Sequence, residues 1–296
     1  MYMVVFGGNG RAGQAMCQAA RAAGWEVVCP THEECDLLQP AAVSDFVLAH
    51  ADARAVVNCA AISGLETCMD DALGAHLVNA VSPAEMALAC RHTGARFVHL
   101  STDYVLEGRR PGKKAEKARC KPINTYGESK REGELQMLEN NAEALALRVS
   151  WLCGNPLRPS FVESSLDRAL RGEKLAAIAD KFSLPTHVDD IARVVLQLIL
   201  RDVPGGIYHV TSCGEPLSWH GCACIALAHA VELGALPTMP PVEAQQLESV
   251  SFFRTPRPRH TAMDNAALLA LGIPMPTAEE TIRRAADAML AYRARV

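Results

Sequence analysis

The sequence predicts an α/β fold: a doubly wound parallel sheet with helices on both faces, followed by a smaller C-terminal part. Two observations predict it. Short apolar segments alternate with helical segments over the first half of the 296-residue chain. The first apolar segment also leads directly into a glycine-rich turn and a helix, the order in which such sheets usually begin. We expect strands at 1–6, 25–29, 54–61, 96–102 and 144–152, and helices at 14–23, 41–50, 75–92 and 125–140.

The glycine turn, Gly7-Gly-Asn-Gly-Arg-Ala-Gly13, follows the first strand without a gap. Glycines let the backbone turn tightly, and the helix that follows offers free N–H groups and its positive dipole end to a pyrophosphate. Strand, glycine turn and helix in this order predict a Rossmann-like dinucleotide site. Two spacings fit, either Gly8, Gly10 and Gly13 or Gly7, Gly10 and Gly13, and the sequence does not choose between them.

The second strand ends in Pro30-Thr-His32, where NAD-preferring sites usually carry an acidic residue for the ribose 2′-hydroxyl. Glu33 and Glu34 come slightly late. Arg11, in the glycine turn, could bind a 2′-phosphate through two parallel hydrogen bonds, or could be a solvated turn residue. We therefore expect NADPH, with NADH as the open alternative.

The expected strands bring three segments to one edge of the sheet. Ligands of open parallel sheets bind beyond the carboxyl ends of the strands. Gly7, Ala60 and Thr102 each follow or end such a strand. We expect these three residues to border one crevice.

Tyr126 and Lys130 lie four residues apart on an expected helix, downstream of the strand that ends at Thr102. Residues with this spacing share a helix face. At about 4 Å and an effective dielectric near 20, a unit charge favours a phenolate by roughly 4 kcal/mol. The Lys130 ammonium is therefore expected to lower the pKa of Tyr126, which could then donate a proton to a developing alkoxide. Two exposed helix residues are the alternative.

The second half of the chain has a different texture, with a loop at 154–159 and a Pro-rich loop reaching residue 241. Thr277 and Glu280 form a capping-box pattern that begins a last helix. We expect a dinucleotide-binding domain at 1–150, to which 184–212 returns, and a mainly substrate-binding domain at 151–183 and 213–296. In this second half of the chain we expect helices at 161–170, 188–200 and 217–233 and strands at 174–179 and 206–210.

Composition excludes several function classes. With 49% hydrophobic and 21% charged residues, the chain is typical of a soluble globular protein. A net charge of −4 gives no reason to expect nucleic acid or an anionic membrane as a partner. No apolar stretch has the length of a membrane span, and a strand that begins at residue 1 leaves no room for a signal peptide. The eleven scattered cysteines, with no Cys-x-x-Cys pair, predict free thiols in a reducing cytoplasm and no zinc or other metal site.

The motifs together resemble the dTDP-4-dehydrorhamnose reductases, a branch of the extended short-chain dehydrogenase/reductases. The resemblance runs nearly from end to end. Its most specific part is Ser101-Thr-Asp-Tyr-Val105 with the downstream Tyr-Gly-x-x-Lys, since many folds share the glycine turn. It rests on Phe6–Gly13, Asp36-Leu37, Val57–Ala61, Leu77–Ala80, Ser101–Val105, Pro122–Gly127 with Lys130, Arg148–Trp151, Asp180–Thr186 and Arg257-Pro258.

The resemblance implies roles for individual residues. Tyr126 would be the proton donor, Lys130 would bind the ribose and tune Tyr126, and Thr102 would hydrogen-bond the substrate carbonyl. Substrate contacts would come from Thr102, Asp103, Trp151 and Arg257. The cofactor would be lined by Gly7, Gly10, Arg11, Ala12 and Gly13 at the pyrophosphate, Asp36 and Leu37 at the adenine, and Ala60 and Ala61 at the nicotinamide half.

The chain also departs from the family pattern, mainly around the sugar. Pro30 stands where many members carry an acidic residue, and Ile62–Cys68 lacks the usual Val-Asp pair. His260 replaces a common Asn, and Leu106 and Cys153 replace frequent aromatic residues. The chemistry is therefore expected to be retained, with the sugar and the nucleotide left open.

The function expected from these residues is reduction of the 4-keto group of a nucleotide-activated deoxysugar by NAD(P)H. An NADP-binding regulatory subunit without turnover and a sugar-nucleotide epimerase are the alternatives. The expected partner is a small sugar nucleotide, with no nucleic acid and no membrane, and the chain could form a homodimer.

Four smaller signals have a structural alternative. His187 could bind substrate or begin a helix at the surface, and Asp189-Asp190 suit the dipole at a helix start. Residues 254–259 could pair with a diphosphate or form a solvated loop. Asn79 is expected to be a buried polar residue that braces a neighbouring strand.

Overall fold

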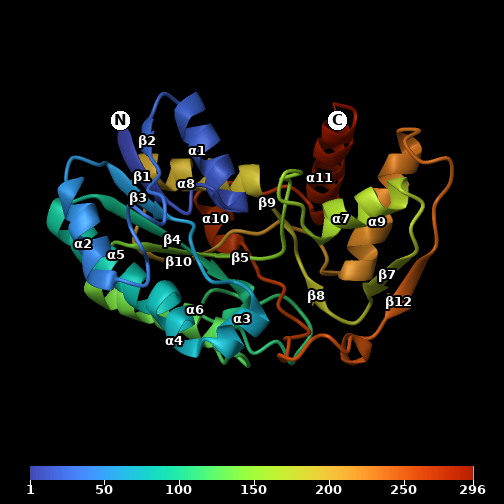
Figure 1. Cartoon of the computed structure of the whole chain (residues 1–296), viewed down its shortest axis with the longest axis horizontal. Helices are drawn as coiled ribbons and strands as arrows, with labels where there is room; N and C mark the ends of the chain where they lie inside the picture. The colour runs from blue at the N-terminus through green and yellow to red at the C-terminus, as the bar shows by residue number, and fades with distance from the viewer. Residues whose placement is uncertain (296) are drawn as a thin grey trace.

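A six-stranded sheet forms the centre of the protein, which a computed structural model describes over residues 1–295 (Figure 1). All neighbouring strands are parallel, in the order β10-β5-β4-β3-β1-β2. The order reverses between β1 and β3, the point at which open parallel sheets bind ligands. The expected α/β fold is confirmed. The strands are β1 (Tyr2–Phe6), β2 (Glu26–Val28), β3 (Ala55–Asn58), β4 (Arg96–Thr102), β5 (Leu145–Val149) and β10 (Gly206–His209).

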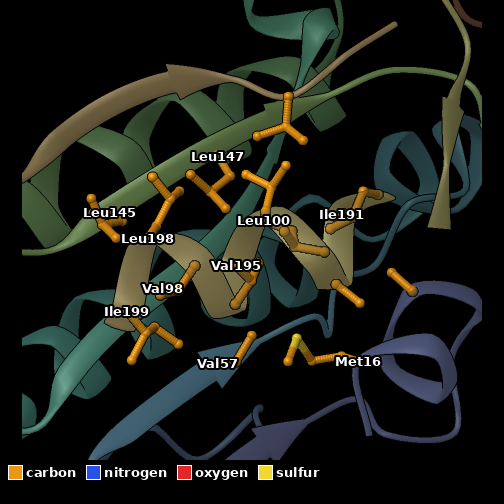
Figure 2. Close-up of a cluster of buried hydrophobic side chains, with 14 of the residues drawn as sticks. Met16, Val57, Val98, Leu100, Leu145, Leu147, Ile191, Val195, Leu198 and Ile199 are labelled. Carbon is orange, nitrogen blue, oxygen red and sulfur yellow. The ribbon is translucent and has the colours of Figure 1, made fainter. Parts of the chain in front are cut away.

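Both faces of the sheet are covered by helices, because successive residues along the buried strands point to opposite faces and nearly all are apolar. α1 (Arg11–Ala22) and α8 (Val188–Leu200) cover one face. α2 (Pro40–Ala49), α5 (Ser82–Thr93) and α6 (Thr125–Asn140) cover the other. Burial of each large apolar side chain contributes about 1.5–3 kcal/mol. Figure 2 shows Ile191, Val195, Leu198 and Ile199 of α8 gathered against Val57, Val98, Leu100, Leu145 and Leu147 of the sheet, with Met16 of α1 at the edge of the cluster.

A second layer of helices lies beyond the carboxyl edge of the sheet, at the right in Figure 1. It has its own core, formed between α7 (Phe161–Leu170), α9 (Trp219–Glu232) and α11 (Ala278–Arg293). Three small two-stranded sheets complete this part. They pair β7 (Leu175–Ile178) with β12 (Val242–Gln245), β8 (Phe182–Ser183) with β11 (Leu217–Ser218), and β6 (Leu152–Cys153) with β9 (Thr186–His187).

Several helix boundaries follow from local caps. The Asn124 side chain accepts a hydrogen bond from the Gly127 amide at 2.8 Å and starts α6 where the sequence predicts. Ser160 and Glu163 form a capping box at α7, and the Thr277–Glu280 box begins α11 as expected. α5 ends at Gly94, whose φ of +79° suits a glycine C-cap.

Other elements differ from the expectation. The segment 75–92 is not one helix: α4 (Ala72–His76) passes through a π-helical turn at Leu77–Val81 into α5. The sequence predicts no helix at 65–70, but the structure has the short helix α3 (Leu65–Asp70) there. β12 and α10 (Ala266–Ala270) fall in segments where the sequence predicts no element. β12 has two apolar and two polar residues and pairs with β7.

Three further observations bear on the class of protein. Within residues 1–295, no helix is both long and apolar enough to cross a bilayer. In the same part of the chain, no group of three or more His, Cys, Asp and Glu side chains is arranged to bind a metal ion. All eleven cysteines are free thiols.

Candidate active site

The glycine turn joins β1 to α1 at the carboxyl edge of the sheet, beside the end of β3. Gly7 has a φ of +73°, and a Cβ on it would lie 2.7 Å from the amide nitrogen of Ala60. A Cβ on Gly13 would overlap the Gly7 carbonyl, to which the Gly10 amide donates a hydrogen bond of 2.8 Å. Of the two spacings left open, Gly7, Gly10 and Gly13 is therefore the one in which each glycine meets backbone. The result is a backbone cradle without side chains.

An open cavity of about 400 Å³ lies on the β2 side of this turn. α1 starts beside it with no side-chain cap, so the first N–H groups of the helix are available to an anion. The cavity brings together five of the expected cofactor residues from distant parts of the chain, but its lining does not include Gly10, Arg11, Ala12, Gly13, Tyr126 or Lys130. Its lining includes Gly7, Asp36, Leu37, Ala60 and Ala61, together with Pro30, Thr31 and His32.

Arg11 lies at a different cavity, of about 430 Å³, which Trp151, Phe161 and Trp219 also line. Its Nε and Nη2 donate hydrogen bonds to the carbonyl oxygens of Arg158 at 2.8 Å and Pro159 at 3.0 Å. The guanidinium therefore joins the glycine turn to the loop before α7. This position does not fit the predicted contact with a 2′-phosphate, because the adenosine ribose belongs on the Pro30 side of the turn. The sequence shows that Arg11 is in the turn, but not to which side it points.

Tyr126 occupies the first turn of α6, which rests on the segment that follows β4. A Cβ on Gly127 would overlap the Tyr104 carbonyl, so only glycine permits this contact. The rings of Tyr104 and Tyr126 meet edge to face, with centroids 5.8 Å apart. Burial raises the pKa of Tyr126, although a hydrogen bond with the Thr102 hydroxyl lowers it in part. Tyr126 and Thr102 therefore lie together, as the sequence predicts.

Lys130 is one turn further along α6 and is 1% exposed. Its Nζ donates a hydrogen bond to the Leu100 carbonyl at 2.6 Å and lies 2.7 Å from His99 Nε2. Burial lowers the pKa of His99 well below its usual value, so the imidazole is neutral and Nε2 accepts. Burial also lowers the pKa of Lys130 to about 7, although the Glu134 carboxylate opposes this.

The predicted tuning of the tyrosine is wrong for this structure. Within residues 1–295 no hydrogen bond joins Lys130 to Tyr126, and the pKa of Tyr126 is raised rather than lowered. The physical reason is that β4 takes the hydrogen bonds of the ammonium, while burial disfavours the phenolate. The two side chains share a helix face, but they are engaged by different partners.

Thr102 and Asp103 end β4. The Thr102 hydroxyl accepts a hydrogen bond from the Tyr104 amide at 3.2 Å and lies 3.3 Å from Asp103 Oδ1. The Asp103 carboxylate is buried among hydroxyl groups that donate to its Oδ2: Ser150 at 3.1 Å, Ser183 at 3.2 Å, and Thr261. Burial raises the pKa of Asp103, and the nearby Lys181 ammonium lowers it in part. Asp103 thus joins β4 to the second half of the chain at the site.

Trp151 lies where β5 passes into the second half of the chain. Its φ of +42° is rare for a residue with a bulky side chain and marks a forced turn. Its ring packs edge to face on Trp219, with centroids 5.9 Å apart. Lys181 was not predicted as a site residue, yet its buried ammonium lies 4.9 Å from the centroid of the Tyr104 ring and 5.6 Å from that of Trp151. Its position in the family-like segment 180–186 was the only signal in the sequence.

Arg257 lies apart from both cavities described above. Its Nη2 is 3.0 Å from Glu66 Oε1 of α3, and its guanidinium lies 3.4 Å from the centroid of the Phe253 ring. Arg254 pairs with Asp70 at 2.6 Å, and Arg259 pairs with Asp180. A third cavity, of about 440 Å³, is lined by Phe253, Arg254, Arg257 and Arg259. The three arginines of the loop 254–259 are therefore ion-paired, and they border a cavity large enough for a polar group of a ligand.

Three of the smaller signals have structural roles. Asn79, in the π-helical turn, exchanges hydrogen bonds of 3.0 and 2.8 Å with the Ile62 backbone, and so braces the chain beyond β3 as expected. His187 caps α8 by accepting from the Asp189 amide at 3.3 Å, but it is buried rather than at the surface. The two acidic residues Asp189 and Asp190 stand in the first turn of α8.

The chain is similar to known proteins over nearly its whole length. A family model described as the RmlD substrate binding domain matches residues 1–291. The spore coat polysaccharide biosynthesis protein SpsK of Bacillus subtilis strain 168 is 30% identical, with 92% of each chain covered. The dTDP-4-dehydrorhamnose reductase of Burkholderia thailandensis is also 30% identical, over 93% of this chain and 95% of its own.

A solved structure has a similar fold. The dTDP-4-dehydrorhamnose reductase of Bacillus anthracis strain Ames, in complex with NADP, superposes with a TM-score of 0.87 at 26% identity, covering 96% of this chain and 98% of that one. The family model and the relatives cover nearly the whole chain, and the resemblance in the sequence is confirmed. This chain belongs to the dTDP-4-dehydrorhamnose reductases, a family of NAD(P)-dependent oxidoreductases.

Proposed function

We propose that this protein reduces the 4-keto group of a nucleotide-activated deoxysugar, with NADPH as the preferred reductant and NADH as the alternative. The observation that carries the proposal is the meeting of Thr102 and Tyr126 at the edge of the sheet where the glycine turn begins. The relatives from Burkholderia thailandensis and Bacillus anthracis are named dTDP-4-dehydrorhamnose reductase, and the latter is in complex with NADP.

The glycine turn fits a dinucleotide. Gly7 and Gly13 leave a cradle that any Cβ would fill, and α1 begins beside it without a side-chain cap. In this proposal the first turn of α1, with Gly10, Arg11 and Ala12, binds the pyrophosphate. Asp36 and Leu37 flank the adenine, and Ala60 and Ala61 border the nicotinamide half. Bound NADPH would supply the hydride that reduces the carbonyl carbon.

Tyr126 acts as the general acid in this proposal. Because burial raises its pKa, the phenol keeps its proton at neutral pH and can donate it to the carbonyl oxygen of the substrate. The Thr102 hydroxyl, which lies beside the same phenol, orients the carbonyl. A neutral donor suits the direction of reduction, in which the oxygen gains a proton as negative charge develops on it.

Lys130 binds the nicotinamide ribose and supplies positive charge near the relay. Since the Lys130 ammonium hydrogen-bonds to β4 in this structure, the proposal requires it to exchange one of these partners for a ribose hydroxyl when the cofactor binds. Asp103, at the end of β4, and Trp151 and Arg257, from the second half of the chain, would then contact the substrate. Segments 151–183 and 213–296 would form most of that surface, with 1–150 and 184–212 holding the cofactor.

Two further parts of the proposal concern the setting. Eleven free thiols suit a reducing compartment, and we propose the cytoplasm. A homodimer stays a prediction, and measuring the mass of the native protein by light scattering tests it.

The decisive assay follows the oxidation of NADPH at 340 nm with dTDP-4-dehydrorhamnose and related 4-keto sugar nucleotides. Tyr126→Phe should lower kcat by about 10²–10⁴ because it removes only the acidic proton. Tyr208→Phe is the matched control: its hydroxyl donates to the Pro204 carbonyl at 2.9 Å on β10, away from the site, and the variant should keep full activity.

Two outcomes would reject the proposal. Tight NADP binding without turnover of any sugar nucleotide would favour a regulatory subunit. Cofactor that stays bound through purification, with no net oxidation of added NADPH, would favour an epimerase.

A further inference from the structure

Two thiols meet directly beneath the glycine turn. Cys17 comes from the buried face of α1, and Cys29 follows the last residue of β2. Their sulfur atoms lie 2.9 Å apart, which is about 0.9 Å more than the ~2.05 Å of a disulfide bond. The two side chains belong to elements that pack on each other in the same core. A small movement of the sulfurs would therefore join α1 covalently to the end of β2.

The pair is in contact with the turn that the proposed cofactor requires. A Cβ on Gly8 would lie 2.8 Å from both Cβ and Sγ of Cys29, and 3.4 Å from Sγ of Cys17. The backbone of the turn thus rests on these two sulfurs. Pro30, the residue after Cys29, lines the adjoining cavity of about 400 Å³. A movement of either sulfur would therefore act directly on the backbone at Gly8, because no other side chain of residues 1–295 lies between them.

The two thiols differ in a way that suits oxidation. Cys17 is 4% exposed, whereas Cys29 is partly exposed and so open to a small oxidant. The hydrogen bond from the Cys17 thiol, and next the nearby Arg21 guanidinium, lower the pKa of Cys29. A thiolate is the reactive form of cysteine. By contrast, burial raises the thiol pKa of Cys35 and Cys68, so these groups stay protonated and less reactive.

We propose that Cys17 and Cys29 are a redox modification site, at which a hydroperoxide forms a reversible disulfide that weakens dinucleotide binding at the glycine turn. The effect on binding rests on the proposed function, whereas the disulfide itself does not. A pair of this kind in a reducing compartment acts as a sensor rather than as a structural bond.

The chemistry balances with one hydroperoxide. The Cys29 thiolate attacks one oxygen of hydrogen peroxide, the O–O bond breaks, and the hydroxide that leaves takes a proton to become water. Cys29 is then a sulfenic acid. The Cys17 sulfur attacks the Cys29 sulfur, the S–S bond forms, and the S–O bond breaks to release a second water. The two thiols lose two electrons, and a dithiol reductant of the thioredoxin class returns them.

The test maps the bond in the whole protein. The reduced protein is treated with hydrogen peroxide, free thiols are blocked, and a tryptic digest is analysed by mass spectrometry. Cleavage after Arg11, Arg21 and Arg54 places Cys17 and Cys29 in separate peptides. The peptide 22–54 also carries Cys35, so fragmentation of the linked pair decides whether Cys29 or Cys35 is bonded to Cys17. We expect the bond between Cys17 and Cys29 to be the main cross-link and to disappear after thioredoxin treatment. A main cross-link from Cys29 to Cys59, or no cross-link at Cys29, would overturn the proposal.

NADPH affinity, measured by fluorescence titration before and after oxidation, tests the consequence. We expect the Kd to rise about tenfold in the oxidised wild type, because the turn is displaced by a sizeable part of 1 Å. Cys17→Ser and Cys29→Ser should keep the reduced affinity and show no change with peroxide. Cys224→Ser, a partly exposed thiol on α9, is the matched control and should respond like the wild type. Thermal unfolding under reducing conditions checks that each variant is folded.

The outcomes separate this inference from the proposed function. If the reduced wild type fails to bind NADPH, the proposed function fails, and the effect on affinity fails with it, while the digest still decides the disulfide. If NADPH binds and peroxide lowers the affinity equally in Cys17→Ser, the site is not this pair.

Discussion

The Lys130 ammonium lies 2.7 Å from the Nε2 atom of His99, inside the sheet–helix interface rather than against the Tyr126 phenol. This contact is made possible by the neutral state of His99, whose pKa burial lowers. A charged imidazole would repel the ammonium, and with both groups buried the repulsion would be strong. The Lys130 ammonium is thus bound to β4, next to the expected position of the nicotinamide ribose.

The first prediction concerns the charge of Lys130. Since burial lowers its pKa to about 7, the ammonium loses its proton as the pH rises through neutrality. We expect kcat/KM for the reduction to fall above about pH 7. Lys130→Arg keeps its charge at all these pH values and should abolish this alkaline limb, although its maximum rate will be lower. The kcat/KM of both proteins is measured from pH 5.5 to 9. If kcat/KM falls above pH 7 in Lys130→Arg as it does in the wild type, another group is responsible.

The second concerns the Thr102 hydroxyl, which lies close enough to the Tyr126 phenol to lower its pKa in part. Thr102→Val keeps the shape of the side chain but removes the hydroxyl, so we expect kcat to fall about 10²–10³-fold with little change in KM. Thr102→Ser should recover most of the rate because it restores the hydroxyl. Steady-state kinetics of the three proteins decide the matter, and equal kcat values in wild type and Thr102→Val would remove Thr102 from the mechanism.

The third concerns the cofactor preference. Arg11 donates to the carbonyls of Arg158 and Pro159 and lies at the cavity of Trp151, away from the Pro30 side of the turn. Arg11→Ala should therefore weaken NADPH and NADH alike, by about tenfold each. The ratio of the two kcat/KM values should stay as in the wild type. A selective loss of NADPH would instead place a 2′-phosphate at this guanidinium.

The fourth concerns stability in acid. Burial, and next the Arg148 guanidinium, lower the pKa of His209 to about 4, so the folded protein binds this proton less readily than the unfolded chain does. Its contribution is complete above the unfolded value of about 6.5, and about 3 kcal/mol is lost as the pH falls from there to 4. His209→Gln should show a shallower loss between pH 6.5 and 4 in urea unfolding. Parallel curves for the two proteins would contradict the assignment.

Local signals were enough to predict many elements to the residue. β4, α6, α7 and α8 have the bounds that the sequence predicts, because caps at their ends and period-2 or helical apolar patterns act over a few residues. The π-helical turn within the expected helix 75–92 was not predicted. This turn depends on Asn79 reaching the Ile62 backbone and the Ser129 hydroxyl, contacts that join residues 17 and 50 positions apart in the chain.

The sequence predicts which strand ends meet at the candidate site, but it does not predict where the long side chains point. Strand order alone brings Gly7, Ala60 and Thr102 to one edge, so their convergence could be foreseen. Arg11 and Lys130 have several rotatable bonds, and their partners come from residues that are distant in sequence. Lys181 was missed for a related reason, since its contacts with Tyr104 and Trp151 exist only after the two halves of the chain have packed together.

Isotope transfer tests whether the protein moves a hydride from NADPH to the 4-keto carbon of a sugar nucleotide. The protein is given NADPH that carries deuterium at the transferable position of C4, together with a 4-keto-6-deoxy sugar nucleotide. We expect one deuterium at C4 of the sugar product and none in the oxidised cofactor, with the transfer lost in Tyr126→Phe. A product without deuterium, or a deuterium count at C4 that does not match the NADP formed, would contradict it.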